Sequence, residues 1–94
     1  MILKTFSASW CVPCKSQKPV IETWSKTHPE VKVETVSVES PEGAAMASKY
    51  FVQSVPYLVV LNESGTVLAA QGGVHDSRRL DALVQAAQRS SLNR

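Results

Sequence analysis

The feature that most constrains this chain is a pair of cysteines, Cys11 and Cys14, spaced C-x-x-C between an apolar segment and a segment of helical character. They are the only cysteines in the sequence. A strand that leads into the start of a helix places the first thiol beside unpaired backbone N–H groups, which favour the thiolate form. A thiolate is the species that attacks a disulfide, so the pattern favours thiol–disulfide exchange.

The length and charge of the chain exclude several other classes of protein. Its 94 residues are enough for one domain, which we expect to span 1–94. The net charge is only +2, so we expect no nucleic-acid partner and no basic membrane patch. No apolar run approaches the roughly 20 residues that cross a bilayer, and the N-terminus lacks the pattern of a signal peptide. We therefore expect a cytoplasmic protein, in which a lone cysteine pair is more often reactive than structural.

Hydrophobic periodicity predicts seven elements in the order β-α-β-α-β-β-α. Pro29 ends the first helix and Pro19 is expected to kink it, whereas Ser40 and Pro41 suit the start of the second. The expected strands are 1–7, 31–38, 57–61 and 66–70, and the expected helices are 11–28, 40–50 and 76–89, with 90–94 frayed.

The connections between these elements predict the sheet. The first two strands, joined through a helix, should be parallel with a right-handed crossover, and the last two should form an antiparallel hairpin. With the first strand central, the sheet order is second, first, third, fourth, and helices cover both faces. The fold class is thus α/β, with a four-stranded mixed sheet and three helices. The second strand lies at an edge, where Lys32 and Glu34 would discourage pairing with another chain, so we expect a monomer.

Several motifs in the right order resemble the thioredoxin family, and the resemblance covers the chain from residue 2 to about residue 87. Val55 and Pro56 resemble the segment that carries the family's cis-proline, and Gly73 resembles the glycine that lets a substrate approach. Pro19 lies where the family kinks its active-site helix. The segment similar to the family's W-C-x-P-C-K active site is Trp10-Cys11-Val12-Pro13-Cys14-Lys15.

The sequence also departs from the family pattern. It starts about where the family's second strand does, as in the shortened core of glutaredoxins. Thr5 and Thr35 stand where thioredoxins usually bury an aspartate and a lysine. Because threonine does not titrate in this range, we expect the proton of the second cysteine to leave by water or to the departing thiolate. Disulfide reduction would then follow a pH profile dominated by Cys11.

The resemblance implies a cycle of protein disulfide reduction. Cys11, exposed at the helix tip, is expected to be the nucleophile, and the shielded Cys14 the resolving thiol. A thioredoxin reductase would reset the pair after disulfide-containing protein substrates have oxidised it. The resemblance implies no cofactor beyond this reversible disulfide, and no metal.

The expected substrate-binding rim is uncharged, which suits a protein partner better than the anionic tripeptide glutathione. Lys15 is either a solvated helix residue or a residue that tunes the thiolate. Two other functions stay open: a glutathione-dependent glutaredoxin-like reductase, and a non-catalytic binding subunit that uses the fold as a platform. The expected rim residues are Trp10, Val12, Pro13, Val55, Pro56, Tyr57, Gly73 and Val74.

Other interpretations of the cysteine pair are weaker. A structural staple across a four-residue loop stabilises little, about 2 kcal/mol by chain entropy. A closed zinc site needs four ligands, and only His28 and His75 remain, at spacings unlike any such site. We expect both histidines at the surface without a chemical role.

Overall fold

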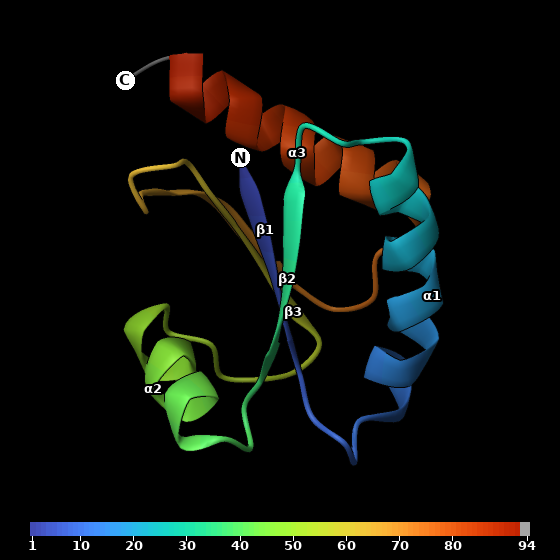
Figure 1. Cartoon of the computed structure of the whole chain (residues 1–94), viewed down its shortest axis with the longest axis vertical. Coiled ribbons are helices and arrows are strands. Elements are labelled where there is room, and N and C mark those ends of the chain that lie inside the picture. The colour runs from blue at the N-terminus through green and yellow to red at the C-terminus, as the bar shows by residue number, and fades with distance from the viewer. Residues whose placement is uncertain (93–94) are drawn as a thin grey trace.

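The computed structural model describes residues 1–92 of the chain and has the predicted element order (Figure 1). None of the helices in this described part is long and apolar enough to cross a membrane. The elements are β1 (Ile2–Ser7), α1 (Val12–Lys26), β2 (Lys32–Ser37), α2 (Pro41–Lys49), β3 (Tyr57–Leu61), β4 (Val67–Gly72) and α3 (Ser77–Leu92).

Most boundaries differ from the sequence prediction by one to three residues, and the largest differences are at the ends of α1, β4 and α3. β4 continues to Gly72, because Gly72 and Gln71 pair with the first residues of β3. The predicted fraying from residue 90 is wrong for 90–92, which stay helical in α3. The second half of α3 contains no glycine or proline, so nothing in the sequence interrupts the helix there. Asn93 and Arg94 lie outside the described residues.

The four strands form one sheet in the order β2-β1-β3-β4, as predicted. β1 runs parallel to β2 and antiparallel to β3, and β3 and β4 form an antiparallel hairpin. α1 and α3 lie on one face of the sheet and α2 on the other, which gives three layers (Figure 1).

Alternation along β1 divides the interior between the two faces of the sheet. Leu3 packs with the α1 and α3 residues Trp24 and Leu80, whereas Phe6 packs with Ala47 of α2. Because β1 is central, its last residue leads directly from this buried sheet into the segment that carries the two cysteines.

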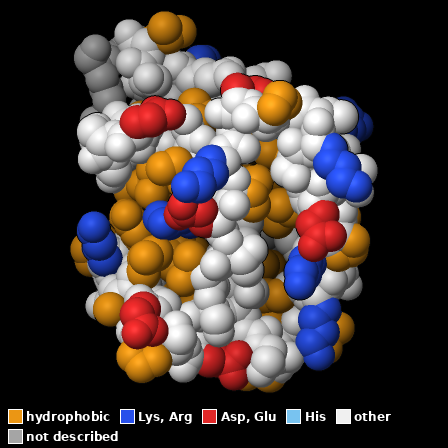
Figure 2. All heavy atoms as spheres, in the orientation of Figure 1, with side chains coloured by type: hydrophobic (Ala, Val, Ile, Leu, Met, Phe, Trp, Pro, Cys, Tyr) orange, Lys and Arg blue, Asp and Glu red, His pale blue; other side chains and the backbone are white. Residues whose placement is uncertain are grey.

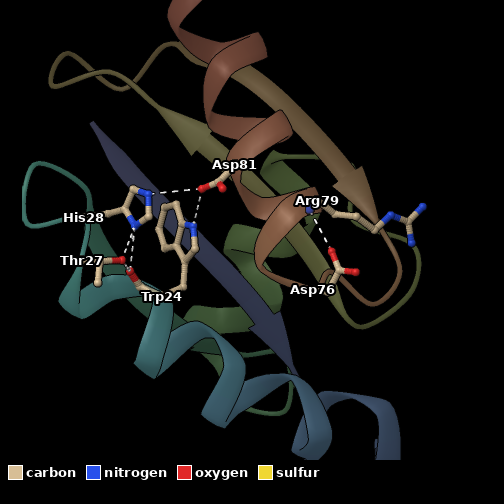
Figure 3. A network of polar contacts seen from close by, with 6 residues as sticks. All are labelled: Trp24, Thr27, His28, Asp76, Arg79 and Asp81. Atoms are coloured by element: carbon tan, nitrogen blue, oxygen red, sulfur yellow. Dashed lines mark hydrogen bonds and ion pairs between the residues drawn. The ribbon is translucent and has the colours of Figure 1, made fainter.

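The C-terminal half of α1 is joined to α3 by a hydrogen bond from an aromatic side chain (Figure 3). Trp24 is buried, and its Nε1 donates to Asp81 Oδ1 at 2.9 Å. The His28 ring stacks on Trp24 with centroids 3.9 Å apart, and its Nε2 lies 3.2 Å from the same Asp81 oxygen. His28 was predicted at the surface, but this stacking leaves it only partly exposed. We call Trp24, His28 and Asp81 the distal tie.

β2 forms the edge of the sheet and its backbone crosses the middle of Figure 2, with hydrophobic side chains on both sides. Lys4 Nζ lies 2.6 Å from Glu34 Oε1, and Lys32 Nζ lies 3.4 Å from the other carboxylate oxygen. The hydrogen bond from Lys4, together with the nearby Lys4 and Lys32 charges, holds the pKa of Glu34 below its usual value. That these charges prevent pairing with a second chain stays a prediction.

Candidate active site

Cys11 is the N-cap residue of α1, with extended backbone angles of φ −88° and ψ 102°. Its amide donates to the Ala8 carbonyl at 3.1 Å, and its Sγ accepts the Cys14 amide at 3.2 Å. Pro13 lies in the first turn, where a helix needs no N–H. The expected position of the first sulfur at a helix N-terminus is confirmed.

The two cysteines form a disulfide, with Cα atoms 5.3 Å apart. Cys14 is 7% exposed, in agreement with its expected shielding, but Cys11 is only 3% exposed. The expectation of an exposed Cys11 sulfur is therefore wrong for this oxidised state. Cys11 is covered by local packing, because Ala8 is buried with both cysteines and Val38 and Val55 pack against them.

The expected rim residues come from three segments, which the structure brings together. The Val55–Pro56 peptide bond is cis, and Val55 packs against the cysteine cluster. The Gly73 amide donates to the Pro56 carbonyl at 2.9 Å, so the loop after β4 lies against the cis-proline segment. Pro56 itself is buried, and Pro13 is exposed. The largest exposed apolar side chains of the rim are those of Trp10 (69%), Val12 (69%) and Val74 (46%).

Gly72, the last residue of β4, and Gly73 of the rim disfavour a side chain for different reasons. A Cβ on Gly72 would lie 3.0 Å from Cδ1 of the Tyr57 ring, a distance at which one of the two must shift. A Cβ on Gly73 would meet nothing within 4 Å, but the φ of Gly73 is +96°, a conformation that other residues rarely adopt. The predicted role of Gly73 in substrate approach stays a prediction.

The segment before Cys11 is held by Glu39, which the sequence reasoning missed. Both the amide and the hydroxyl of Ser9 donate to the Glu39 carboxylate, and these hydrogen bonds hold its pKa below the usual value. The strand register could have revealed this pair, because β1 and β2 are parallel and Ser7 lies opposite Ser37. Continuing that register by two residues places Ser9 beside Glu39, just ahead of Trp10.

A cavity of about 370 Å³ lies between α1 and the sheet and reaches Cys14 but not Cys11. Thr5 and Thr35 line it, with their hydroxyl oxygens 3.5 Å apart. Two neutral hydroxyls therefore lie at the positions where thioredoxins usually bury an aspartate and a lysine. The cavity gives a route by which water could reach Cys14, but the expected pH profile stays a prediction.

His75 was predicted at the surface, and this is wrong: it is 2% exposed. Its Nδ1 lies 2.9 Å from the Gly73 carbonyl oxygen, and its backbone is held by the side chain of Gln17. In residues 1–92, no three His, Cys, Asp or Glu side chains gather where they could hold a metal ion. Lys15 is exposed to solvent and also lines the cavity.

Comparison with known proteins agrees with this geometry. The thioredoxin family model matches residues 1–88. The chain is 36% identical over 84 residues to thioredoxin C-2 of Corynebacterium nephridii, covering 88% of this chain and 75% of that protein. It is 34% identical over 84 residues to the thioredoxin of Bacillus subtilis strain 168, covering 89% and 79%. A mutant thioredoxin from Halobacterium salinarum NRC-1 superposes with a TM-score of 0.79 at 32% identity, covering 92% of this chain and 74% of that one.

A C-x-x-C disulfide at the N-terminus of a helix that follows a central strand defines a thiol–disulfide oxidoreductase. The sheet order and the layers match those of solved thioredoxins. The chain belongs to the thioredoxin family. Proteins of this family act on protein disulfides and are reset by a reductase.

Proposed function

We propose that this chain reduces protein disulfides, with Cys11 as the nucleophile and Cys14 as the resolving thiol. The Cys11 thiolate attacks one sulfur of a substrate disulfide, that S–S bond breaks, and a mixed disulfide forms. The Cys14 thiolate then attacks the Cys11 sulfur, and the substrate leaves with both of its sulfurs reduced. The two electrons come from the dithiol, which ends as the Cys11–Cys14 disulfide described above. A flavin-containing thioredoxin reductase returns them.

The observation that carries this proposal is the position of the dithiol. The Cys14 amide points at the Cys11 sulfur from the first turn of α1, and this hydrogen bond favours a thiolate there. Cys14 itself lies one turn further and is already bonded to Cys11, so it is within reach for the resolving step. Both features are needed for a mixed disulfide to form and then to be released.

The rim supports a protein as the substrate. Its exposed apolar side chains, Trp10, Val12 and Val74, suit the apolar centre of a protein interface. Within residues 1–92, neither the amide nor the carbonyl of Val55 has a hydrogen-bond partner, so both are available to an extended peptide. These contacts hold the substrate disulfide where Cys11 can attack it.

The test is a Cys14→Ser variant incubated with oxidised insulin. Without its resolving thiol, the variant should accumulate a mixed disulfide through Cys11, visible as a covalent adduct by mass spectrometry and lost on reduction. A Cys11→Ser/Cys14→Ser double variant is the control and should form none. Failure of Cys14→Ser to form any adduct while its Cys11 thiol is intact would contradict the assigned roles.

A glutaredoxin-like activity is the second candidate. Arg79 favours it, because its guanidinium donates to the Val74 carbonyl and so places a cation beside the rim that an anionic tripeptide could use. The electron donor distinguishes this activity from protein disulfide reduction. A protein disulfide reductase should be reduced by NADPH and a flavin reductase, and a glutaredoxin by glutathione.

A non-catalytic binding subunit is the third candidate, and a double cysteine variant that keeps full biological activity would favour it. We also propose a cytoplasmic setting and a monomer. A dithiol that is regenerated in every cycle works in a reducing compartment, where structural disulfides are rare.

A further inference from the structure

The backbone of the segment Gly73–His75, beside the dithiol, is held by side chains at each of its three carbonyls. His75 Nδ1 lies 2.9 Å from the Gly73 oxygen, Arg79 Nη1 donates to the Val74 oxygen at 3.0 Å, and Gln17 Nε2 donates to the His75 oxygen at 2.5 Å. Backbone carbonyls outside helices and strands are often left to water. Here they are fixed one after another, in a segment where Gly73 has a positive φ.

Gln17 is the centre of this arrangement. It lies on α1 three residues after Cys14, on the same face of the helix, and is only 3% exposed. Its Oε1 accepts the His75 amide at 2.6 Å, while its Nε2 donates to the carbonyl of the same residue. Because His75 offers one backbone donor and one backbone acceptor, only this orientation of the amide satisfies both. Both polar atoms of a buried glutamine are thus paired with main chain 58 residues away.

The contacts continue from Gln17 to the other side of the rim. Gln17 holds the backbone of His75, the His75 ring faces the Gly73 carbonyl, and the Gly73 amide donates to the Pro56 carbonyl at 2.9 Å. Since Gln17 and Cys14 are on one helix, these hydrogen bonds connect the dithiol to both backbone segments of the rim. We call Gln17 and His75 the proximal tie.

We propose that Gln17 is a positioning residue for substrate binding, and that it acts through His75 on the segment Gly73–His75. Glycine loses more conformational freedom on ordering than any other residue, and a rim that is ordered in advance spares the substrate that cost. The proximal tie therefore raises the affinity for a docked protein disulfide without touching the reacting sulfurs. This inference rests on the proposed function, because it concerns how the same rim receives its substrate.

The test replaces Gln17 by methionine, which keeps the length and bulk of the side chain but removes both hydrogen bonds. The KM for insulin reduction, driven by NADPH and a flavin reductase, should rise by about five- to tenfold, the equivalent of one net hydrogen bond. The kcat and the rate at which iodoacetamide alkylates Cys11 in the reduced protein should stay the same. Trp24→Phe is the matched control, since it removes a hydrogen bond from the same helix at the distal tie and should leave KM unchanged.

Hydrogen exchange gives a second readout that does not depend on activity. The Gly73 amide is bonded to Pro56 and not to Gln17, so it should exchange faster in Gln17→Met only if the whole segment has become mobile.

The ring of His75 is tested with two variants. His75→Asn can still donate to the Gly73 carbonyl through its side-chain amide, and it should keep a KM nearer to wild type than His75→Leu does.

An unchanged KM in Gln17→Met, or unchanged exchange at Gly73, would overturn the positioning role. An equal rise of KM in Trp24→Phe would overturn it too, because a general loss of stability would then explain both. If the wild-type protein fails to reduce insulin, the proposed function is wrong, while exchange at Gly73 still decides whether Gln17 orders the segment.

Discussion

Within residues 1–92, side chains of α1 form hydrogen bonds with distant parts of the chain at two places, and the two differ in what they hold. The proximal tie joins the Gln17 side chain to the backbone of His75, next to the dithiol. The distal tie joins Trp24 to the side chain of Asp81 on α3, one helix against another (Figure 3). Hydrogen bonds to main chain fix the path of a loop, whereas a buried aromatic ring fixes the distance between two helices.

The energetic balance of the two ties differs as well. Trp24 removes a large apolar surface from water, and its single hydrogen bond to Asp81 adds little to that. Gln17 buries a polar amide, whose hydrogen bonds mainly offset the cost of its own burial. The distal tie should therefore account for stability and the proximal tie for the geometry of the rim.

The largest expected effect comes from Trp24→Ala. Removing a buried aromatic side chain should lower the free energy of unfolding by about 3–5 kcal/mol, measured by urea denaturation. At a temperature where the variant is still folded, its KM for insulin should equal that of wild type. If KM rises with the loss of stability, the two ties are not separable and the contrast between them fails.

Asp76→Ala tests a neighbour of His75 that is outside the proximal tie. Asp76 Oδ1 accepts the Arg79 amide at 2.9 Å, so it caps the start of α3 (Figure 3). Losing this cap should cost about 1 kcal/mol in unfolding free energy, measured as a fall in Tm. KM should stay unchanged, because Gln17 still holds the backbone of His75. A large rise in KM would show that the rim depends on α3 itself.

The smallest effect is expected from Glu34→Gln on the sheet, outside both ties. Because the pKa of Glu34 lies below its usual 4.5, its pairing with Lys4 contributes stability that is fully present above pH 4.5 and is lost as the pH falls through the lower folded-state pKa. For a single, partly buried ion pair at the edge of the sheet the contribution is about 1 kcal/mol or less. Thermal melts should show a wild-type advantage at pH 7 that shrinks below pH 4.5. A constant difference across this range would contradict the assignment.

The parts of the molecule that follow from local pattern could be predicted from the sequence. Hydrophobic periodicity predicted the seven elements, the connections between them predicted which strands run parallel or antiparallel, and a central first strand then implied the sheet order. The cysteine spacing gave the sulfur at the helix N-terminus. The cis peptide at Pro56 came from resemblance to the thioredoxin family, since an X-Pro bond alone does not reveal its isomer.

The parts that depend on contacts distant in sequence could not be predicted. The Gln17 side chain meets the backbone of His75, and a backbone group leaves no trace in the sequence. A signal did exist, since Gln17 interrupts the buried stripe of Cys14, Ile21 and Trp24, and a polar residue there needs a partner. The burial of Cys11 depends on valines that reach it from beyond α1, so the helix position alone did not reveal it.

The enclosed disulfide has a consequence for how this protein exchanges electrons. With both cysteines under a tenth exposed, the S–S bond offers little surface to a thiol in bulk solvent. The sulfur of a reducing partner has to reach the bond where Val38 and Val55 now pack against the cysteines. If a flavin reductase is the electron donor, as proposed above, the fit of its surface to the rim decides how fast the oxidised protein regains its two electrons.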